Sequence, residues 1–153
     1  MAAENTTQQP QPEFFIQRLY VKDISFESPQ APKVFQETLQ PSVNLNIQTS
    51  SNVLADDTHD VTVTATITAA VDGRTIFLVE IKQAGIFTIK HIPKDNMPFV
   101  LGVTCPTILF PYLREAVSDL VARGGFQHFY LSPINFEALF LANQKETATA
   151  TKQ

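Results

Sequence analysis

The alternation of apolar and polar residues predicts a first strand near the start of the chain. Leu19 and Val21 lie at positions of one parity, whereas Ile24 and Phe26 lie at positions of the other. A strand whose side chains alternate with period two can change parity only through a bulge or a twist, and we expect one near Lys22.

Three further segments alternate in the same way: residues 43–47, 61–69 and 75–83. The polar stretch 49–58 is expected to form a turn. The Asp72-Gly73 dipeptide predicts a tight hairpin between the last two strands.

That hairpin also predicts which side chains share a face. With a two-residue turn at Asp72-Gly73, Ile67 would face Leu78 and Thr66 would face Val79, so both faces of the sheet would carry apolar side chains. Two helices cover one face only, and the other is expected to be covered by another copy of the chain or to act as an adhesive surface. The alternative is an ordinary core with one partly wet face.

The second half of the chain changes to the helical period. A helix is expected to start at Thr107 or Phe110 and to stop at Gly124-Gly125. A short second helix is expected over residues 136–143. Strands followed by helices predict an α+β fold with helices packed on an antiparallel sheet.

The ends of the chain are expected to be mobile tails around one domain. Residues 1–13 are rich in Gln and Pro, and residues 142–153 lack an apolar period. The domain is expected to span residues 14–141, and Asn135 is expected to cap its last helix.

Composition excludes several classes of function. The chain has 153 residues, 44% of them hydrophobic and 17% charged, with a formal net charge of −4. A globally disordered chain is excluded, and nucleic acid is disfavoured as the main partner because phosphate binding needs clustered Lys and Arg. The N-terminus has no apolar core of a secretory signal, and no run of about 20 apolar residues is present, so we expect a cytoplasmic protein.

The search for catalytic chemistry finds little. Asp56, Asp57, His59 and Asp60 form the one acidic and imidazole cluster, in a segment expected to be a solvated turn. The single cysteine, Cys105, is expected to be a small buried side chain. With no glycine-rich phosphate loop either, we expect no enzyme activity, no metal and no cofactor.

Aromatic residues are abundant where connections are expected. The chain has 12 Phe and no Trp, and apolar clusters fall at residues 85–89, 97–101 and 126–130. Such surfaces suit promiscuous binding of extended apolar segments, because apolar contact is non-directional. The alternatives are plain core filling and an enclosed pocket for one defined apolar ligand.

Carboxylates also gather on expected strands. Asp23 and Glu27 share one strand face, about 13 Å apart, and Leu78 and Glu80 share another. Carboxylates beside an apolar anchor suit a basic protein partner, whereas the alternative is a solvated sheet face.

Five motifs, in order over residues 14–140, resemble the SecB family of bacterial protein-export chaperones. They are YVKDISFE at 20–27 followed by Pro29, LADD at 54–57, QAGIF at 83–87, CPTILFPY at 105–112 and LSPINFEALF at 131–140. The resemblance implies a four-stranded antiparallel sheet with one long and one short C-terminal helix, assembled as a cytosolic homotetramer, a dimer of dimers. It also implies an ATP-independent chaperone that binds unfolded preproteins, keeps them translocation-competent and delivers them to the export motor ATPase, SecA.

The resemblance also assigns roles to residues. It implies motor binding by Asp23, Glu27, Leu78 and Glu80, and an oligomer-sensitive set at Val79, Ile81 and Gln83. The client-binding groove is implied at Phe35, Leu39, Phe126, Phe129, Tyr130, Phe136, Leu139 and Phe140.

Two departures from the family concern the groove and the tail. Many relatives carry Trp where this chain has Leu39, and the tail that makes an auxiliary contact with the motor is short and only mildly acidic here. Two other functions stay open: a small domain that binds a defined apolar ligand, and a chaperone of the same fold that serves a toxin–antitoxin pair.

Overall fold

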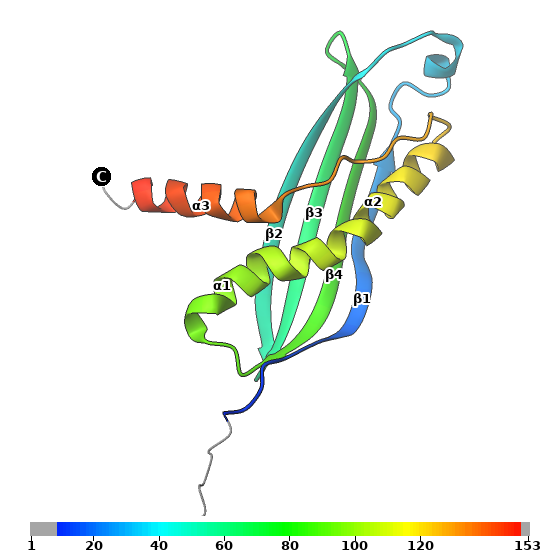
Figure 1. Ribbon diagram of the computed structural model, residues 1–153. Helices are drawn as coiled ribbons and strands as arrows, with labels where there is room; N and C mark the ends of the chain where they lie inside the picture. Colours follow the sequence, from blue (N-terminus) through cyan, green and yellow to red (C-terminus); the bar gives the residue numbers. More distant parts are fainter. Residues whose placement is uncertain (1–8, 151–153) are drawn as a thin grey trace, which may run out of the picture.

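The computed structural model describes residues 9–150 and consists of one sheet with helices on one side (Figure 1). Four antiparallel strands lie in the order β1-β4-β3-β2. Their bounds are β1 Glu13–Glu27, β2 Ser42–Ala55, β3 Thr58–Val71 and β4 Arg74–Lys90. The predicted fold class is confirmed.

Strand β1 carries the predicted bulge. Val21 pairs with Gln83 and Asp23 pairs with Lys82, so Lys22 is the extra residue between them. A second register shift lies between Ile16 and Arg18, which the sequence pattern did not indicate.

The hairpin between β3 and β4 forms at the predicted turn but in a different register. Asp72 and Gly73 have φ of 48° and 77°, values that suit a tight hairpin turn. The pairing then shifts by one residue, because Ile76 is an extra residue between Thr75 and Phe77. The predicted pairs of residues 66 and 67 are therefore wrong.

The corrected register separates apolar from polar side chains. Ile67 pairs with Val79 and Ala65 with Ile81, so β3 and β4 present apolar residues to the helices. We call this the helix side and the opposite one the outer face, where Thr66 pairs with Glu80. The expectation of two apolar faces is wrong for these strands.

Two strands run further than predicted. Strand β2 continues to Ala55, and the turn before β3 is limited to Asp56 and Asp57, of which Asp57 has φ of 61°. Strand β4 continues to Lys90, so residues 85–89 lie within a strand and not at a connection.

Helix α2 (Cys105–Arg123) also begins earlier than predicted. It continues a helical run formed by η2 (Lys94–Asn96), α1 (Met97–Phe99) and a π-helical turn, η3 (Val100–Thr104). Because proline has no N–H, Pro106 cannot make the usual helical hydrogen bond, and the wider π turn ends at Thr104, two residues before it.

Helix α2 crosses the helix side of the sheet (Figure 1). Leu109, Leu113, Val117 and Val121 recur at spacings of four residues and are fully buried. By length and composition alone, the helical run 94–123 could cross a membrane, because an 18-residue window within it has a mean hydropathy of 1.3. A core helix meets the same criteria, and the buried stripe of α2 lies against β3 and β4.

Helix α2 ends at Gly124 and Gly125, as predicted, with Gly125 at φ of 88°. The side chain of Asn135 accepts a hydrogen bond from the backbone N–H of Ala138 at 3.0 Å, which confirms the cap of α3 (Phe136–Ala150).

Helix α3 extends beyond the expected end at residue 143, through a segment rich in good helix formers. Much of the predicted C-terminal tail is thus helical, while residues 1–8 and 151–153 lie outside the described part. The mobility of both tails stays a prediction.

A short 3₁₀ helix, η1 (Lys33–Gln36), lies in the connection between β1 and β2. Its Val34 is buried and belongs to the core, whereas Phe35 is half exposed. The connection from α2 to α3 runs back across the helix side of the sheet (Figure 1).

Candidate functional site

The predicted acidic residues lie together on the outer face of β1 and β4. Glu27 pairs with Leu78, and Glu80 pairs with Ser25, two residues along β1. Asp23 follows at the next position on the same face. We call Asp23, Glu27, Leu78 and Glu80 the acidic face. Its carboxylates are accessible, because Asp23 and Glu27 are exposed and Glu80 is partly so.

A second polar group on the outer face holds a nearby lysine. The Lys22 ammonium donates to Asp60 Oδ2 at 2.8 Å and to Thr62 Oγ1 at 3.0 Å, and the Tyr20 hydroxyl donates to Asp60 Oδ1 at 2.6 Å. Asp60 is 6% exposed, so this is a partly buried ion pair. These hydrogen bonds connect β1 to β3 across β4 and direct the Lys22 ammonium toward Asp60.

These contacts shift two pKa values in the same direction. Burial, followed by the hydrogen bond to Asp60, raises the pKa of Tyr20 above that of a free phenol. The hydrogen bond to Asp60 raises the pKa of Lys22, against an opposing effect of burial. The folded protein therefore holds both protons more tightly than the unfolded chain.

This linkage predicts a loss of stability in alkali. A raised folded-state pKa contributes stability that is complete below about pH 10 and is lost as the pH rises through the folded value. Urea unfolding from pH 8 to pH 11 should show the free-energy advantage of the wild type over Asp60→Asn shrinking above pH 10. A difference that stays constant over this range would contradict the assigned role of Tyr20 and Lys22.

Five phenylalanine rings form a cluster at the hairpin end of the helix side. Phe77 stacks on Phe26 with a ring-centroid distance of 6.1 Å and approaches Phe126 at 5.0 Å and Phe129 at 6.5 Å. Phe35 joins through Phe126 at 5.3 Å. We call these five residues the aromatic cluster. Three of them were predicted groove residues, whereas Phe26 and Phe77 were missed because they belong to predicted strands.

Two glycines allow this cluster to close over the end of α2. A Cβ atom on Gly124 would clash with the Phe26 ring, and one on Gly125 would lie 3.1 Å from the Phe35 ring. The backbone at the end of α2 thus contacts two rings of the cluster directly. Predicted as a helix stop, the Gly124-Gly125 pair also makes room for aromatic side chains.

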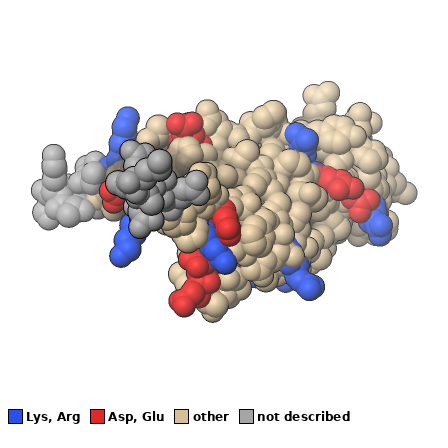
Figure 2. Space-filling model, turned by 60° about the horizontal axis from the view of Figure 1, so that its bottom comes forward, with Lys and Arg blue, Asp and Glu red and all other residues tan. Residues whose placement is uncertain are grey.

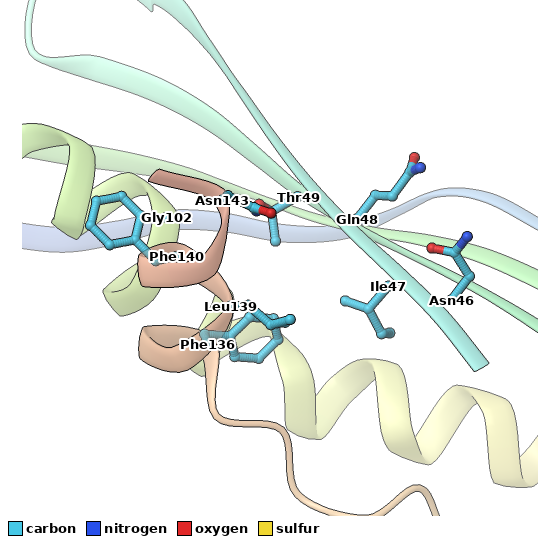
Figure 3. A pocket seen from close by; sticks show the side chains of 9 residues that line it. All are labelled: Asn46, Ile47, Gln48, Thr49, Gly102, Phe136, Leu139, Phe140 and Asn143. Carbon is cyan, nitrogen blue, oxygen red and sulfur yellow. The ribbon is translucent and has the colours of Figure 1, made fainter. Parts of the chain in front are cut away.

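A pocket opens between β2 and α3 (Figure 3). Its volume is about 400 Å³, and Phe136 and Leu139 lie on the side of α3 that faces Ile47. Phe140 packs against Gly102 of η3 and edge-on against Phe99, at 6.0 Å. We call this site the α3 pocket. It brings together the three predicted groove residues of the last helix.

The two remaining groove residues lie apart from these sites. Tyr130 is 72% exposed and lies by a shallow hollow over α2, beside His128. Leu39 is partly buried and packs against the core. The predicted groove residues therefore fall on the aromatic cluster, the α3 pocket, the α2–α3 connection and, for Leu39, the connection between β1 and β2.

The predicted oligomer-sensitive residues face inward in the single chain. Val79 and Ile81 are fully buried on the helix side, and Gln83 is 4% exposed. The expectation that one subunit leaves this strand face uncovered is wrong, because the register shift at Ile76 turns these side chains toward α2.

Catalytic or metal chemistry finds little support in the described residues. Within residues 9–150, no group of three or more His, Cys, Asp or Glu side chains could hold a metal ion. Asp60 and His59 lie on opposite faces of β3. Cys105 is fully buried, which confirms that expectation, and burial raises its thiol pKa to about 12. A thiol with this pKa stays protonated and is a poor nucleophile at neutral pH.

Apolar surface is exposed along both edges of the sheet. The exposed apolar residues of the edge strands are Phe15, Ile16, Val21 and Ile24 on β1, and Val43, Leu45, Val53 and Leu54 on β2. Figure 2 shows wide uncharged areas, formed by polar and apolar residues alike, between scattered charges on the face it draws. Exposed apolar side chains gathered along an edge strand mark a surface that binds other chains.

Comparison with known families gives one strong match. The sequence profile of the family described as "Preprotein translocase subunit SecB" matches residues 7–147. A protein of Nitrosomonas eutropha named "Protein-export protein SecB" is 50% identical over 147 residues, which cover 95% of this chain and 92% of that one. A protein of the same name from Nitrosospira multiformis is 47% identical over 140 residues, covering 92% and 88%.

A solved structure shares the fold. The Mycobacterium tuberculosis SecB-like chaperone, in complex with a ChAD peptide from the HigA1 antitoxin, superimposes with a TM-score of 0.66. The match covers 79% of this chain and 90% of that one, at 16% sequence identity. At this identity the likeness concerns the fold alone.

Proposed function

The chain belongs to the SecB family, and from that membership we propose that it is an ATP-independent chaperone for protein export. It binds unfolded precursor proteins in the cytoplasm, keeps them translocation-competent and delivers them to the motor ATPase SecA. The observation that supports this proposal is that the apolar sites and the acidic face lie on opposite sides of the sheet. The aromatic cluster and the α3 pocket lie among the helices, whereas the acidic face lies on the opposite side of the sheet.

The aromatic cluster and the α3 pocket suit extended apolar client segments. Both are built from rings and aliphatic side chains, and several of these remain half exposed, such as Phe35 and Leu139. Each buried apolar side chain of a client contributes about 1.5–3 kcal/mol before ordering costs. Several weak sites on one particle then add up through avidity and hold a client without ATP.

The acidic face suits the motor. Exposed carboxylates around the partly buried Leu78 provide charge steering toward a basic surface and an apolar anchor at its centre. Because Lys22 is paired with Asp60, its charge is drawn away from Asp23. We assign motor binding to Asp23, Glu27, Leu78 and Glu80.

Assembly as a homotetramer, a dimer of dimers, would cover the apolar surface beside β1. A hollow of about 480 Å³ between β1 and α2 is lined by Val21 and Tyr112, both exposed in the single chain. A second copy of the chain on this hollow would bury them. Val79, Ile81 and Gln83 then affect assembly indirectly, through the position of α2 above them.

The proposal predicts a measurable particle and activity. Size-exclusion chromatography with light scattering should give a mass near four times the 17.0 kDa of one chain. The same particle should suppress aggregation of a denatured precursor protein without ATP. A monomer that leaves aggregation unchanged would contradict the proposal and favour a domain that binds a defined small ligand.

A chaperone for a toxin–antitoxin pair is the second candidate, because the M. tuberculosis structure of this fold holds an antitoxin peptide. Sequence favours export: the identity to proteins named for export is 47–50%, against 16% for that chaperone. The presence of the complete acidic face also favours a motor partner.

A further inference from the structure

The bulge at Lys22 decides which side chains of β1 reach the acidic face. Before the bulge, Leu19 and Val21 point to the helix side, and after it Ile24 and Phe26 do so. Without the extra residue, alternation from Val21 would turn Asp23 toward α2 and Ile24 outward. The same bulge therefore sends the carboxylates of β1 outward and Phe26 inward, into the aromatic cluster.

Polar side chains hold this bulge from both sides of the sheet. On the helix side, Gln83 donates its side-chain amide N–H to the backbone carbonyl of Tyr20 at 3.2 Å. On the outer face, the ammonium of Lys22, the extra residue itself, is bound by Asp60 and Thr62. A bulge interrupts the ladder of backbone hydrogen bonds, so such side-chain bonds stabilise it.

Gln83 is a buried amide between apolar register neighbours, at the bottom of the hollow between β1 and α2. It is 4% exposed, and its register neighbours on the helix side are Val21 and Val63. Burying an amide among apolar side chains is unfavourable unless its hydrogen bonds are made. The bond to the Tyr20 carbonyl gives this buried amide a function that Leu or Val could not perform.

We propose that Gln83 is a positioning residue for the acidic face: it holds the bulge at Lys22 and thereby directs Asp23 and Glu27 toward the partner. This inference rests on the proposed function, since it assigns the partner docked there to the export motor. It gives Gln83 a role distinct from the oligomer-sensitive one implied by family resemblance.

The first test is Gln83→Leu, with Gln17→Leu as the matched control. Gln17 is the extra residue of the other irregularity in β1, and its amide donates to Thr88 Oγ1 at 2.6 Å, far along the strand from the acidic face. We expect Gln83→Leu to weaken binding to purified motor about tenfold and Gln17→Leu less than twofold. Light scattering on each variant reports whether the tetramer is intact.

The second test is Lys22→Met, which separates positioning from charge. Removing a positive charge beside carboxylates should strengthen binding to a basic partner if charge alone matters. If Lys22 acts by positioning the acidic face, Lys22→Met should instead weaken motor binding about threefold or more. Hydrogen exchange gives a readout without the motor: the amides of residues 22–24 should exchange about tenfold faster in both variants.

The outcomes are distinguishable. A wild-type protein that does not bind the motor refutes the proposed function itself. A wild type that binds, with Gln83→Leu and Lys22→Met matching it in affinity and in exchange, overturns the role of Gln83. The role is also overturned if Gln83→Leu binds weakly only where the tetramer has dissociated and Lys22→Met binds at least as well as the wild type.

Discussion

Charge reversal on the acidic face, by Asp23→Lys or Glu80→Lys, should lower the affinity for the export motor roughly 30-fold or more. Removing one side of a close interfacial charge pair costs about 2–5 kcal/mol, and reversal adds repulsion. Client binding should not change, because both residues point away from the aromatic cluster and the α3 pocket. Titration of each variant with motor and with an unfolded precursor measures both affinities.

Glu13→Lys is the matched control for this experiment. Glu13 lies on the same strand and the same face, paired with Lys90 at the far end, and its reversal changes the net charge equally. We expect a loss of less than about threefold that disappears at higher salt, as for exposed charges beyond a Debye length. If Glu13→Lys weakened motor binding as much as Asp23→Lys, docking would depend on overall charge and not on this face.

The sequence was most informative where one strand pattern decides the structure. The change of parity between Val21 and Ile24 predicted the bulge, and the side chains after it fell on the faces expected for them. The hairpin turn was equally clear from Asp72-Gly73. The register of the hairpin was not clear. A single extra residue, Ile76, shifts every later pair by one residue and so exchanges the faces, and no sequence motif indicates this shift.

The start of the long helix was predicted incorrectly for a related physical reason. The predicted start was Thr107 or Phe110, whereas a π turn joins the segment from Lys94 to α2, which continues through Pro106 and Pro111. The acidic residues were predicted individually from their strand positions, whereas the groove could be predicted only as regions of the chain. The partners Tyr20 and Asp60 are 40 residues apart, and Phe26 and Phe77 meet only once the sheet has formed.

Phe77→Ala should destabilise the domain by about 3–5 kcal/mol, the usual range for deleting a buried ring. Phe77 is 4% exposed and contacts Phe26, Phe126 and Phe129, so its loss leaves a cavity within the aromatic cluster. Phe126 and Phe129 would then lose their support on the sheet. Urea unfolding measures the change, and Phe77→Leu, which keeps part of the volume, should cost less.

The same variant links stability to client binding, and Tyr130→Ala separates the two. Tyr130 is 72% exposed, so its removal should change the free energy of unfolding by less than about 0.5 kcal/mol. Its aromatic face should nevertheless be available to clients, and we expect Tyr130→Ala to weaken binding of an aromatic-rich unfolded peptide several-fold. Phe77→Ala should weaken binding of the same peptide, because the remaining rings of the aromatic cluster are held less firmly, even where the protein remains folded. If Phe77→Ala bound the peptide normally despite its lost stability, the aromatic cluster would be core packing alone, and client binding would have to be assigned to the α3 pocket.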